Sequence, residues 1–389
     1  MMSGFIELPW WGYIAVALVF THLTIASVTI YLHRHQAHRA LELHPLPSHF
    51  FRFWLWLTTG MITREWSAIH RKHHAKCETA DDPHSPQVLG IKKVFWEGAE
   101  LYRAARNDRE GIAKYGYGAP DDWLERNVYA AHSGKGIALM LAVNLILFGP
   151  IGLTIWAVQM AWIPVTAAGI INGIGHYWGY RNFQAEDASR NVLPWGILIG
   201  GEELHNNHHA YASSARLSNK WYEFDIGWMY IRIMEIIGLA QVKKVAPTLR
   251  LDAAKTHCDF DTLHSVITHR YEVLATYAKS LKKTLADEVH HIVEVARQYD
   301  VDHPTLKRWL LADAKTLQQH EREKLSLFLS KAQVLDKVYT MREELTAVWE
   351  RSAESKEHLL KQLNDWCHRA EESGIEVLQH FSRRLRCYA

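Results

Sequence analysis

The chain has 389 residues and a formal net charge of +2, so it is long enough for two domains and is not expected to need a nucleic-acid partner. Its four scattered cysteines exclude a disulfide scaffold, and its 48% share of hydrophobic residues excludes a disordered or collagen-like chain. The 25 histidines and 16 tryptophans are unusually many, and membrane interfaces are one place where tryptophan collects.

The first predicted element is a membrane-spanning helix. No Asp, Glu, Lys or Arg occurs from Leu8 to His33, and about 20 apolar residues suffice to cross a bilayer core. A signal peptide is the competing interpretation, but no Lys or Arg precedes Arg34 and the apolar run is too long. Residues 50–62 are also apolar, yet this stretch is short and is expected to lie at the interface or to re-enter the membrane.

A second stretch without charged residues runs from Gly136 to Tyr180. Gly149 and Pro150 interrupt it, which predicts two helices joined by a tight turn. The connection from Thr63 to Lys135 carries 12 Lys and Arg residues, whereas none precedes Trp10. The positive-inside rule therefore places the N-terminus outside and this connection in the cytoplasm. Three spans are expected, with everything after Tyr180 in the cytoplasm.

The C-terminal tail has a different composition. From Leu251 to Ala389, Gly374 and Pro304 are the only Gly and Pro in a segment rich in Leu, Ala, Glu, Lys, Gln and Arg, which predicts soluble amphipathic helices. Residues 340–389 resemble the helical end of some transposases, without an accompanying set of metal-binding carboxylates. We expect an all-α integral membrane protein with two domains, a membrane domain of residues 1–250 and a soluble helical extension of residues 251–389.

Histidines gather in four clusters at or after the ends of the predicted spans. Two of the clusters have the sequence H-x-x-H-H, whose spacing of i, i+3 and i+4 puts three imidazoles on one face of a helix. A third cluster pairs an asparagine with a histidine four residues later, again on one face. The clusters comprise His33 and His38; His70, His73 and His74; Asn172 and His176; and His205, His208 and His209.

The first cluster does not fit a straight helix. His33 and His38 lie about 140° apart on an ideal α-helix, so the helix must end or bend there if both bind one metal ion. The predicted topology puts all four clusters at the same membrane face, an agreement that buried core histidines have no reason to show. Metal binding is therefore the preferred interpretation. Isolated histidines such as His22, His35 and His84 are instead expected to be hydrogen-bonded core residues.

The number of candidate ligands indicates more than one ion. Nine histidines exceed what one four- to six-coordinate ion needs, so two ions are expected. Imidazole suits iron, zinc, copper and nickel. A zinc hydrolase usually carries a carboxylate base inside the cluster, as in H-E-x-x-H, and neither triplet has one. Two irons held largely by neutral nitrogen fit oxygen activation better.

The ordered boxes H-x-x-x-x-H, H-R-x-H-H, N-x-x-x-H and H-N-x-H-H between membrane spans resemble those of membrane-bound fatty-acid desaturases, and most closely the bacterial acyl-CoA delta-9 branch. The resemblance covers roughly Ile14 to Val245. It implies an O2-dependent enzyme of the stearoyl-CoA 9-desaturase type, which introduces a double bond at carbon nine of a saturated C16–C18 acyl group. Acyl-CoA is the expected substrate, and an acyl lipid is the alternative. It also implies a di-iron cap that faces the cytoplasm from a bacterial inner membrane, with the lipid bilayer and a long-chain acyl substrate as partners.

The resemblance also assigns residues to roles. One iron would be bound by His33, His38, His70, His205 and His209, and the other by His73, His74, His176 and His208, with Asn172 reaching it through water. Glu202 and Glu203 would orient the imidazoles, a role that ligating histidines commonly require. No catalytic residue beyond the metal centre is implied.

Departures from the family pattern leave the partners open. Ala68 and Ile69 stand where the acyl-CoA branch commonly has Arg-Asp, and Ser85–Val88 replaces a basic run, so the acyl carrier is open between CoA, a carrier protein and a phospholipid. The H-P-G-G motif of a fused haem carrier does not occur, so a separate electron donor such as a ferredoxin-type reductase is expected. The family normally has four spans, but 32 residues before His33 allow one, and three remain our count.

Two other functions fit parts of the pattern. A fatty-acyl hydroxylase has the same scaffold, and only the product, an alcohol rather than a double bond, separates it from a desaturase. A non-catalytic metal transporter or sensor would need polar residues within the spans along an ion path. From Gly136 to Tyr180 such residues are few and none is acidic, which makes this the weakest of the alternatives.

Overall fold

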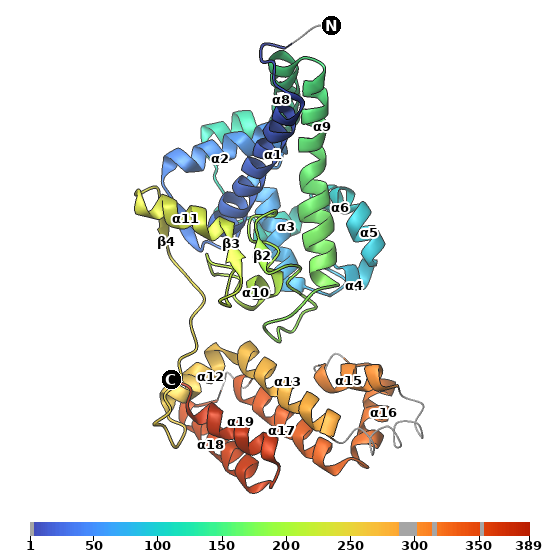
Figure 1. Cartoon of the computed structure of the whole chain (residues 1–389), viewed down its shortest axis with the longest axis vertical. Coiled ribbons are helices and arrows are strands. Elements are labelled where there is room, and N and C mark those ends of the chain that lie inside the picture. The colour runs from blue at the N-terminus through green and yellow to red at the C-terminus, as the bar shows by residue number, and fades with distance from the viewer. Residues whose placement is uncertain (1–3, 288–301, 313–316, 351–353) are drawn as a thin grey trace. The chain divides into compact units, whose positions relative to one another are not determined.

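The computed structural model describes residues 4–287, 302–312, 317–350 and 354–389. The chain divides into two compact units, Met1–Ala246 and Pro247–Ala389, which we describe separately (Figure 1). The expectation of a mostly helical fold is confirmed. Parts of the predicted helical tail, namely residues 288–301, 313–316 and 351–353, lie outside the described residues.

The first apolar stretch forms one continuous helix whose geometry changes along its length. The helix α1, Trp10–Ala26, continues without a break as the π-helix η1 over Ser27–Ala37. Together they form a helix of 28 residues that is long and apolar enough to cross a membrane. Trp10 and Trp11 are exposed at its start, as expected for residues at a membrane interface.

The second apolar stretch forms the predicted hairpin. The helices α8, Ser133–Phe148, and α9, Ile151–Ile163, pack against each other and are joined at Gly149, whose φ of +63° is a conformation that glycine adopts without strain. α9 continues through η3, Pro164–Gly173, and η4, Ile174–His176. Within the described residues, this long helix and the first one are the two candidate spans, and α8 is a shorter apolar helix.

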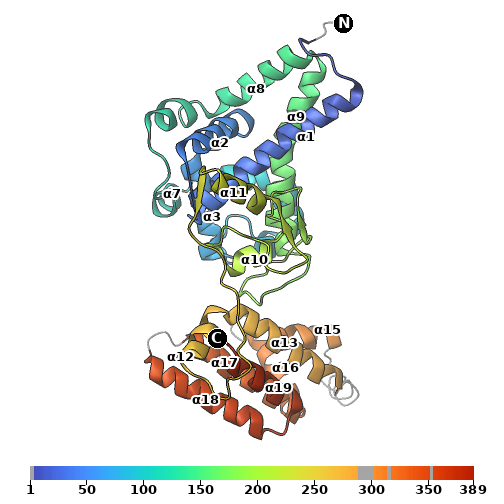
Figure 2. The ribbon, with the colours of Figure 1, turned by 60° about the vertical axis from the view of Figure 1, so that its left-hand side comes forward.

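The N-terminal segment lies beside the tip of this hairpin. The N–H groups of Phe5 and Ile6 donate to the carbonyls of Ile146 and Leu147 at 3.1 and 2.8 Å. The helix α1 packs along α9 from this end of the unit, as two views show (Figures 1 and 2). The N-terminal segment and the hairpin turn therefore share one end of the apolar helices, and the predicted histidines lie at the other end.

Short helices connect the apolar ones. α2, Pro45–Thr58, covers much of the short apolar stretch and packs against α8, and α3, Thr63–Lys76, packs against η1. The other connecting elements are α4, Pro86–Leu89; α5, Ile91–Trp96; α6, Gly98–Ala105; α7, Arg109–Tyr115; η2, Glu125–Tyr129; α10, His205–Ala210; and α11, Ile226–Ile236.

Two small sheets depart from the all-α fold that we expected. β1, Leu41–Leu43, is antiparallel to β4, Ala240–Val242, with Leu41 opposite Val242. β2, Trp195–Gly196, is parallel to β3, Phe224–Asp225. Each sheet joins segments that are far apart in the sequence, and so ties the end of the first helix and the loop before α10 to the segment around α11.

A buried ion pair fastens the first helix to Asp225, the N-cap residue of α11. Both terminal nitrogens of Arg34 donate to the Asp225 carboxylate at 3.0 Å, and they also donate to the carbonyls of Gly200 and Ala215 at 2.9 and 2.8 Å. A Cβ on Gly201 would lie 2.3 Å from Asp225 Oδ1, and the φ of Gly201 is +99°, so the close approach requires glycine. Removing one partner of such a buried pair typically costs about 3–5 kcal/mol.

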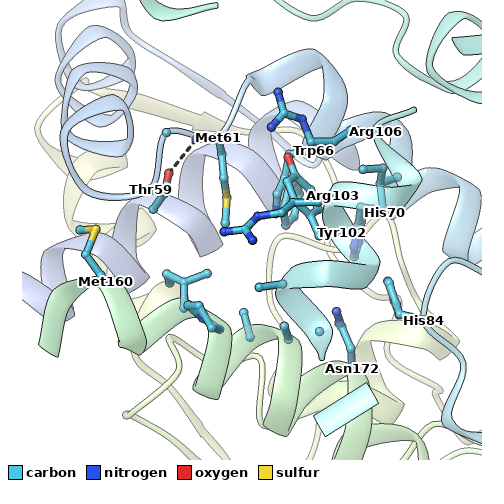
Figure 3. A pocket seen from close by; sticks show the side chains of 18 of the residues that line it. Thr59, Met61, Trp66, His70, His84, Tyr102, Arg103, Arg106, Met160 and Asn172 are labelled. Carbon is cyan, nitrogen blue, oxygen red and sulfur yellow. Dashed lines mark hydrogen bonds between the residues drawn. The ribbon is translucent and has the colours of Figure 1, made fainter. Parts of the chain in front are cut away.

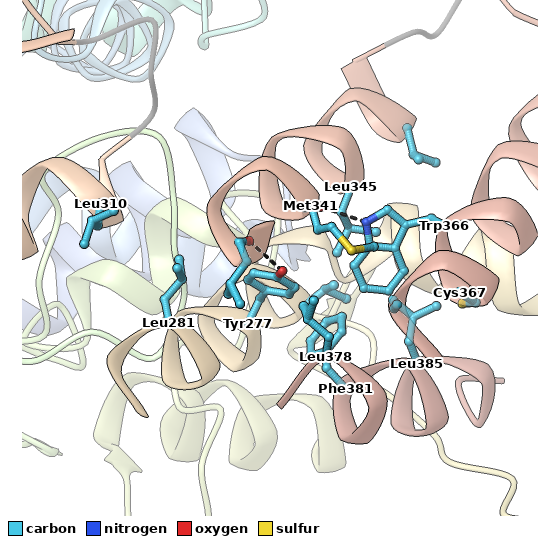
Figure 4. Packing of buried hydrophobic residues seen from close by; sticks show 14 of the residues in the cluster. Tyr277, Leu281, Leu310, Met341, Leu345, Trp366, Cys367, Leu378, Phe381 and Leu385 are labelled. Atoms are coloured by element: carbon cyan, nitrogen blue, oxygen red, sulfur yellow. Dashed lines mark hydrogen bonds between the residues drawn. The ribbon is translucent and has the colours of Figure 1, made fainter. Parts of the chain in front are cut away.

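The unit Pro247–Ala389 is a helical bundle around an apolar core (Figure 4). Tyr277, Trp366 and Phe381 pack edge to face in this core, with ring centroids 4.8–6.2 Å apart. Leu335 and Val338, which are three residues apart, are both fully buried, as expected for one face of an amphipathic helix. The described helices are α12, Phe260–Thr268; α13, Arg270–Asp287; α15, His303–Leu311; α16, Gln319–Leu329; α17, Gln333–Glu350; α18, Lys356–Glu372; and α19, Glu376–Arg386.

Candidate metal centre

The π-helix places the first two predicted ligands on one face. In a π-helix each N–H bonds to the carbonyl five residues back, so residues five apart stand nearly above one another. The N–H of His38 donates to the carbonyl of His33 at 3.0 Å, and the two rings are 4.8 Å apart. The helix ends at Ala37, where the spacing requires an end or a bend, and its widened last turns bring both imidazoles together.

The other histidines come from helix ends that meet at the same place. α3 carries one H-x-x-H-H triplet, α10 carries the other, and His176 closes the long helix that begins as α9. Oδ1 of Asn206 accepts the N–H groups of Asn182 and Phe183, each at 2.9 Å, which fixes α10 against the preceding loop. All nine predicted histidines are thereby brought together, and they form two groups.

We call the first set the five-histidine group. The ligating nitrogens of its members all lie within 4.8 Å of one another. Four pairs of Nε2 atoms within it are separated by 2.8–3.2 Å. The group consists of His33, His38, His70, His74 and His208.

We call the second set the four-histidine group; it consists of His73, His176, His205 and His209. Nε2 of His176 lies 3.2 Å from Nε2 of His73 and 2.9 Å from Nε2 of His205. The His209 ring is 4.6 Å from that of His176 and 4.5 Å from that of His205. Two compact sets of imidazoles therefore stand side by side, as two ions would require.

This partition corrects the one implied by the family resemblance. His74 and His208 lie with His33 rather than with His176, and His205 and His209 lie with His176 rather than with His33. Helical geometry explains this partition. Around the helix axis, residue i+4 lies about 40° to one side of residue i, whereas residue i+3 lies about 60° to the opposite side. On each triplet helix the i, i+4 pair serves one group and the middle histidine serves the other.

Carboxylates hold the far nitrogens of four imidazoles. In the five-histidine group, Glu202 Oε1 is 2.8 Å from Nδ1 of His33. In the four-histidine group, the corresponding Nδ1 distances are 3.0 Å for His73 and Asp82, 2.9 Å for His176 and Glu78, and 2.8 Å for His209 and Asp187. A carboxylate at Nδ1 fixes the tautomer and turns the Nε2 lone pair toward the centre, as in metal sites.

The two predicted orienting glutamates differ. Glu202 lies against His33, whereas Glu203 accepts the backbone N–H groups of Ile199 and Gly201 at 2.8 and 3.1 Å. The role expected for Glu203 is therefore corrected: it shapes the loop before α10 rather than orienting an imidazole. Burial raises the pKa of Glu203 to about 7, against the opposing effect of these amide hydrogen bonds.

Sequence reasoning missed three of these carboxylates and one histidine. Glu78, Asp82 and Asp187 were not singled out, and His84 was expected to be an ordinary core residue. The His84 ring lies 4.3 Å from that of His73, and its buried Nδ1 has no hydrogen-bond partner within the described structure. The acidic run E-T-A-D-D-P-H directly after the second box was the available signal.

Two isolated histidines do behave as expected of core residues. Nε2 of His22 lies 2.7 Å from the Tyr230 hydroxyl, and Nδ1 of His35 lies 3.0 Å from the carbonyl of Leu41. Both are thus hydrogen-bonded outside the two groups, which confirms the prediction for these two residues.

The donor set fits two transition-metal ions. Nitrogens bound at about 2.1 Å to one octahedral ion stand about 3.0 Å apart, because adjacent bonds meet at a right angle. The six short Nε2 separations in the two groups are 2.8–3.2 Å. In addition, the buried Nε2 of His209 has no hydrogen-bond partner within the described structure, while its Nδ1 is held by Asp187. The spacing and this unpartnered atom are what bound ions would explain.

Burial keeps these imidazoles neutral, the state that metal binding requires. Burial lowers their pKa values well below 6.5, and repulsion between neighbouring imidazoles adds to the effect. A neutral imidazole presents a lone pair to an ion, whereas a protonated one repels it. The affected residues are His38, His70, His74, His205, His208 and His209.

Comparison with known proteins identifies the unit that carries the two groups. A family model described as fatty acid desaturase matches residues 8–225, more than half of the chain. The chain belongs to the fatty acid desaturase family. The desaturase is thus an oxidoreductase of lipid metabolism associated with a membrane, as the histidine boxes predicted. Its family is generally di-iron, and the two groups are histidine clusters that could bind metal ions.

Named relatives share about the same region. Delta-9 acyl-lipid desaturase 2 of Arabidopsis thaliana is 30% identical over 239 residues, which cover 60% of this chain and 76% of the relative. The sn-1 stearoyl-lipid 9-desaturase of Anabaena variabilis is 30% identical over 244 residues, which cover 61% of this chain and 85% of the relative. A separate model described as transposase matches residues 259–389, which include the region likened to transposases above.

A cavity of about 330 Å³ in the desaturase unit adjoins the histidines (Figure 3). His70, His84 and Asn172 line one part of it, and Met160 lies across the cavity from them. Other apolar lining residues are Met61, Ile137 and Ile163. Asn172, the residue expected to reach a metal through water, therefore faces a largely apolar space beside the metal centre.

Proposed function

We propose that this desaturase inserts a double bond at carbon nine of a saturated C16–C18 fatty acyl group, with O2 as co-substrate. The observation that carries the proposal is the apolar cavity lined by His70, beside two groups of imidazoles spaced for metal ions. Two iron ions in these groups would supply oxygen activation and the removal of two hydrogens. The overall reaction consumes the acyl chain, O2, two electrons and two protons, and it forms the alkene and two waters.

The chain's own residues bind, orient and exclude water. The Nε2 atoms of the nine histidines hold the ions, and the carboxylates at Nδ1 keep the rings in place. Met61, Ile137, Met160 and Ile163 give the methylene chain an apolar surface and keep water from it. Asn172 lines the same cavity as His70 and His84, where its amide can bind a water. Position along the chain is thus set by which carbons the cavity brings beside the histidines.

A membrane lipid is the proposed acyl carrier. The names of both relatives above state that they act on acyl lipids. Tyr102 and Arg103 of α6 and its C-cap residue Arg106 line the cavity, and guanidinium groups suit an anionic head group. The resemblance to acyl-CoA desaturases keeps the CoA thioester, which also carries phosphate, as the alternative. A separate donor such as a ferredoxin-type reductase would deliver the electrons.

We further propose three spans in a bacterial inner membrane, with the metal centre facing the cytoplasm. The three spans would be the first helix, α8, and the long helix that begins as α9. We include α8 because it packs beside α9 and ends at the hairpin turn. The 12 Lys and Arg residues from Thr63 to Lys135 follow the histidine end of the first helix. Residues 1–250 would form the membrane domain and residues 251–389 a soluble extension. Cysteine-accessibility labelling at two exposed positions, with Phe5→Cys and Lys114→Cys, tests this: labelling of both from the same side would contradict it.

The function is tested in a host that lacks its own delta-9 desaturase. The full chain and a generic reductase are expressed, and deuterated stearate is supplied with and without air. We expect unsaturated product at carbon nine that disappears without O2, and that is absent with His208→Ala under air. The lipid and CoA fractions, analysed early in the time course, separate the two carriers. Hydroxystearate in place of the alkene would assign the chain to the hydroxylases, and neither product from an iron-loaded protein with active reductase would overturn the proposal.

A further inference from the structure

The helix α3 carries a fourth ligand-type side chain on the same stripe as its three histidines. His70, His73, His74 and Cys77 stand at i, i+3, i+4 and i+7, the spacing of one helix face. Cys77 is the C-cap residue of α3, with φ −50° and ψ 132°, so it is the last position before the chain turns away. The thiol is therefore delivered to the metal centre by the helix that delivers three imidazoles.

The sulfur lies among the nitrogens of the four-histidine group. Cys77 Sγ is 3.9 Å from Nε2 of His73, which faces the centre, and 3.9 Å from Nδ1 of His176, the nitrogen that Glu78 holds. The ligand atoms of Cys77, His73, His176 and His209 all lie within 4.8 Å of one another. The Nε2 atom of His209, whose side chain is 1% exposed, is the unpartnered buried atom of this set. The sulfur thus lies beside the ion-facing nitrogen of His73, within a set of ligand atoms that could hold an ion.

We propose that Cys77 is a thiolate ligand of the ion in the four-histidine group. The proposal rests on the proposed function, because it requires the metal centre. Sulfur bound at about 2.3 Å and nitrogen at about 2.1 Å to one ion stand about 3.1 Å apart at a right angle and about 4.4 Å apart when opposed. The separation of 3.9 Å to His73 Nε2 falls inside these limits.

Coordination here is a proton exchange without oxidation. The S–H bond of Cys77 breaks, the S–metal bond forms, and the proton passes to a carboxylate or to solvent. Glu78 Oε1, 3.9 Å from the sulfur, is the nearest such acceptor among the described contacts. A coordinating divalent ion deprotonates a thiol outright.

A thiolate would make the two ions chemically unequal. Imidazole is a borderline donor, whereas a thiolate is soft and favours softer ions. The five-histidine group has no cysteine among its described members, so the softer donor would act on one ion alone. The ion of the four-histidine group would then be distinguishable by spectroscopy.

The test uses the full chain in detergent, freed of iron and loaded with Co²⁺. Cobalt bound to imidazole shows weak visible bands, whereas a thiolate adds an intense near-ultraviolet charge-transfer band. We expect this band in the wild-type protein, its loss in Cys77→Ser, and its retention in Cys387→Ser. Cys387 is the matched control because it is a half-buried free thiol in the unit that lacks the two histidine groups.

Cobalt content and the visible bands accompany each spectrum. Cys77→Ser that still binds cobalt and keeps the imidazole bands is folded, so loss of the ultraviolet band then supports the ligand. If Cys77→Ser binds no cobalt, the wild-type protein is loaded instead with ¹¹³Cd²⁺, an ion that favours thiolate ligands. A ¹¹³Cd resonance without the chemical shift typical of a sulfur ligand would then overturn the proposal. Wild-type cobalt bands without the charge-transfer band would overturn the cysteine ligand and leave the metal centre standing. A wild-type protein that binds no cobalt and no iron would overturn both.

Discussion

The two histidine groups stand side by side but are held by different means. One carboxylate, Glu202, orients a ring of the five-histidine group, whereas Glu78, Asp82 and Asp187 orient three rings of the four-histidine group. The five-histidine group depends instead on helices: the π-turns that carry His33 and His38 and the Arg34 ion pair. Both sites thus take their imidazoles from helices, but the second depends more on carboxylates that lie in irregular segments.

The largest expected effect comes from removing one ligand from each group. His73→Ala and His208→Ala should each abolish product and lower iron to about one ion per chain, because each opens a different coordination shell. His22→Ala is the control, since His22 bonds to Tyr230 outside both groups. Metal analysis of the purified variants checks this, and equal iron in all three would contradict the ligand assignment.

A smaller effect should follow from the carboxylates and should sharpen the comparison. Asp82→Asn should weaken the ion of the four-histidine group by about 10–100-fold, because the amide no longer fixes the His73 tautomer. Glu202→Gln should do the same to the ion of the five-histidine group through His33. Chelator competition measures the affinity for each ion. Weaker binding of the same ion in both variants would contradict the assignment of one carboxylate to each group.

The metal-free protein should lose stability as the pH falls. Six buried histidines have folded-state pKa values below 6.5, so the unfolded chain binds more protons than the folded one. Stability is present above the unfolded pKa and is lost below about pH 6.5, by up to about 1.4 kcal/mol per pH unit for each histidine. Four of the six belong to the five-histidine group. Thermal unfolding of the chelated protein from about pH 7.5 to 5.5 measures the slope, and a flat profile would refute it.

The smallest effect is expected at Glu203, the neighbour of an orienting residue. Glu203→Gln should leave both irons bound, because Glu203 accepts from the amides of Ile199 and Gly201 rather than from an imidazole. Stability should fall by about 1 kcal/mol, the usual size of a lost hydrogen bond. Thermal unfolding and iron content, measured beside Glu202→Gln, distinguish the two glutamates. Iron loss in Glu203→Gln equal to that in Glu202→Gln would restore the role expected from the sequence.

Much of the scaffold was predictable because its signals are periodic or compositional. The charge-free stretches predicted the apolar helices, and Gly149 with Pro150 predicted the turn between α8 and α9. Ideal helix geometry required an end or bend between His33 and His38, yet nothing in the residue types announces a π-helix. The change of hydrogen-bond register became visible only in the folded chain.

The division of the ligands into two groups and the identity of the orienting carboxylates were harder to predict from the sequence. The H-x-x-H-H spacing puts three rings on one face, but that face is wide enough to serve two ions, so the spacing alone does not assign His74 or His205. Asp82 and Asp187 lie in irregular segments whose positions depend on tertiary contacts rather than on a period. Local pattern therefore finds helix-borne ligands and misses loop-borne partners.

The central claim is that the two groups hold two irons in different surroundings. Mössbauer spectroscopy of the full chain, reconstituted with ⁵⁷Fe and compared with its measured iron content, tests it most directly. The account predicts two irons per chain in two distinct signals of equal area, one of which is lost in His73→Ala. A single signal from one iron per chain, or no bound iron in a folded protein, would contradict it.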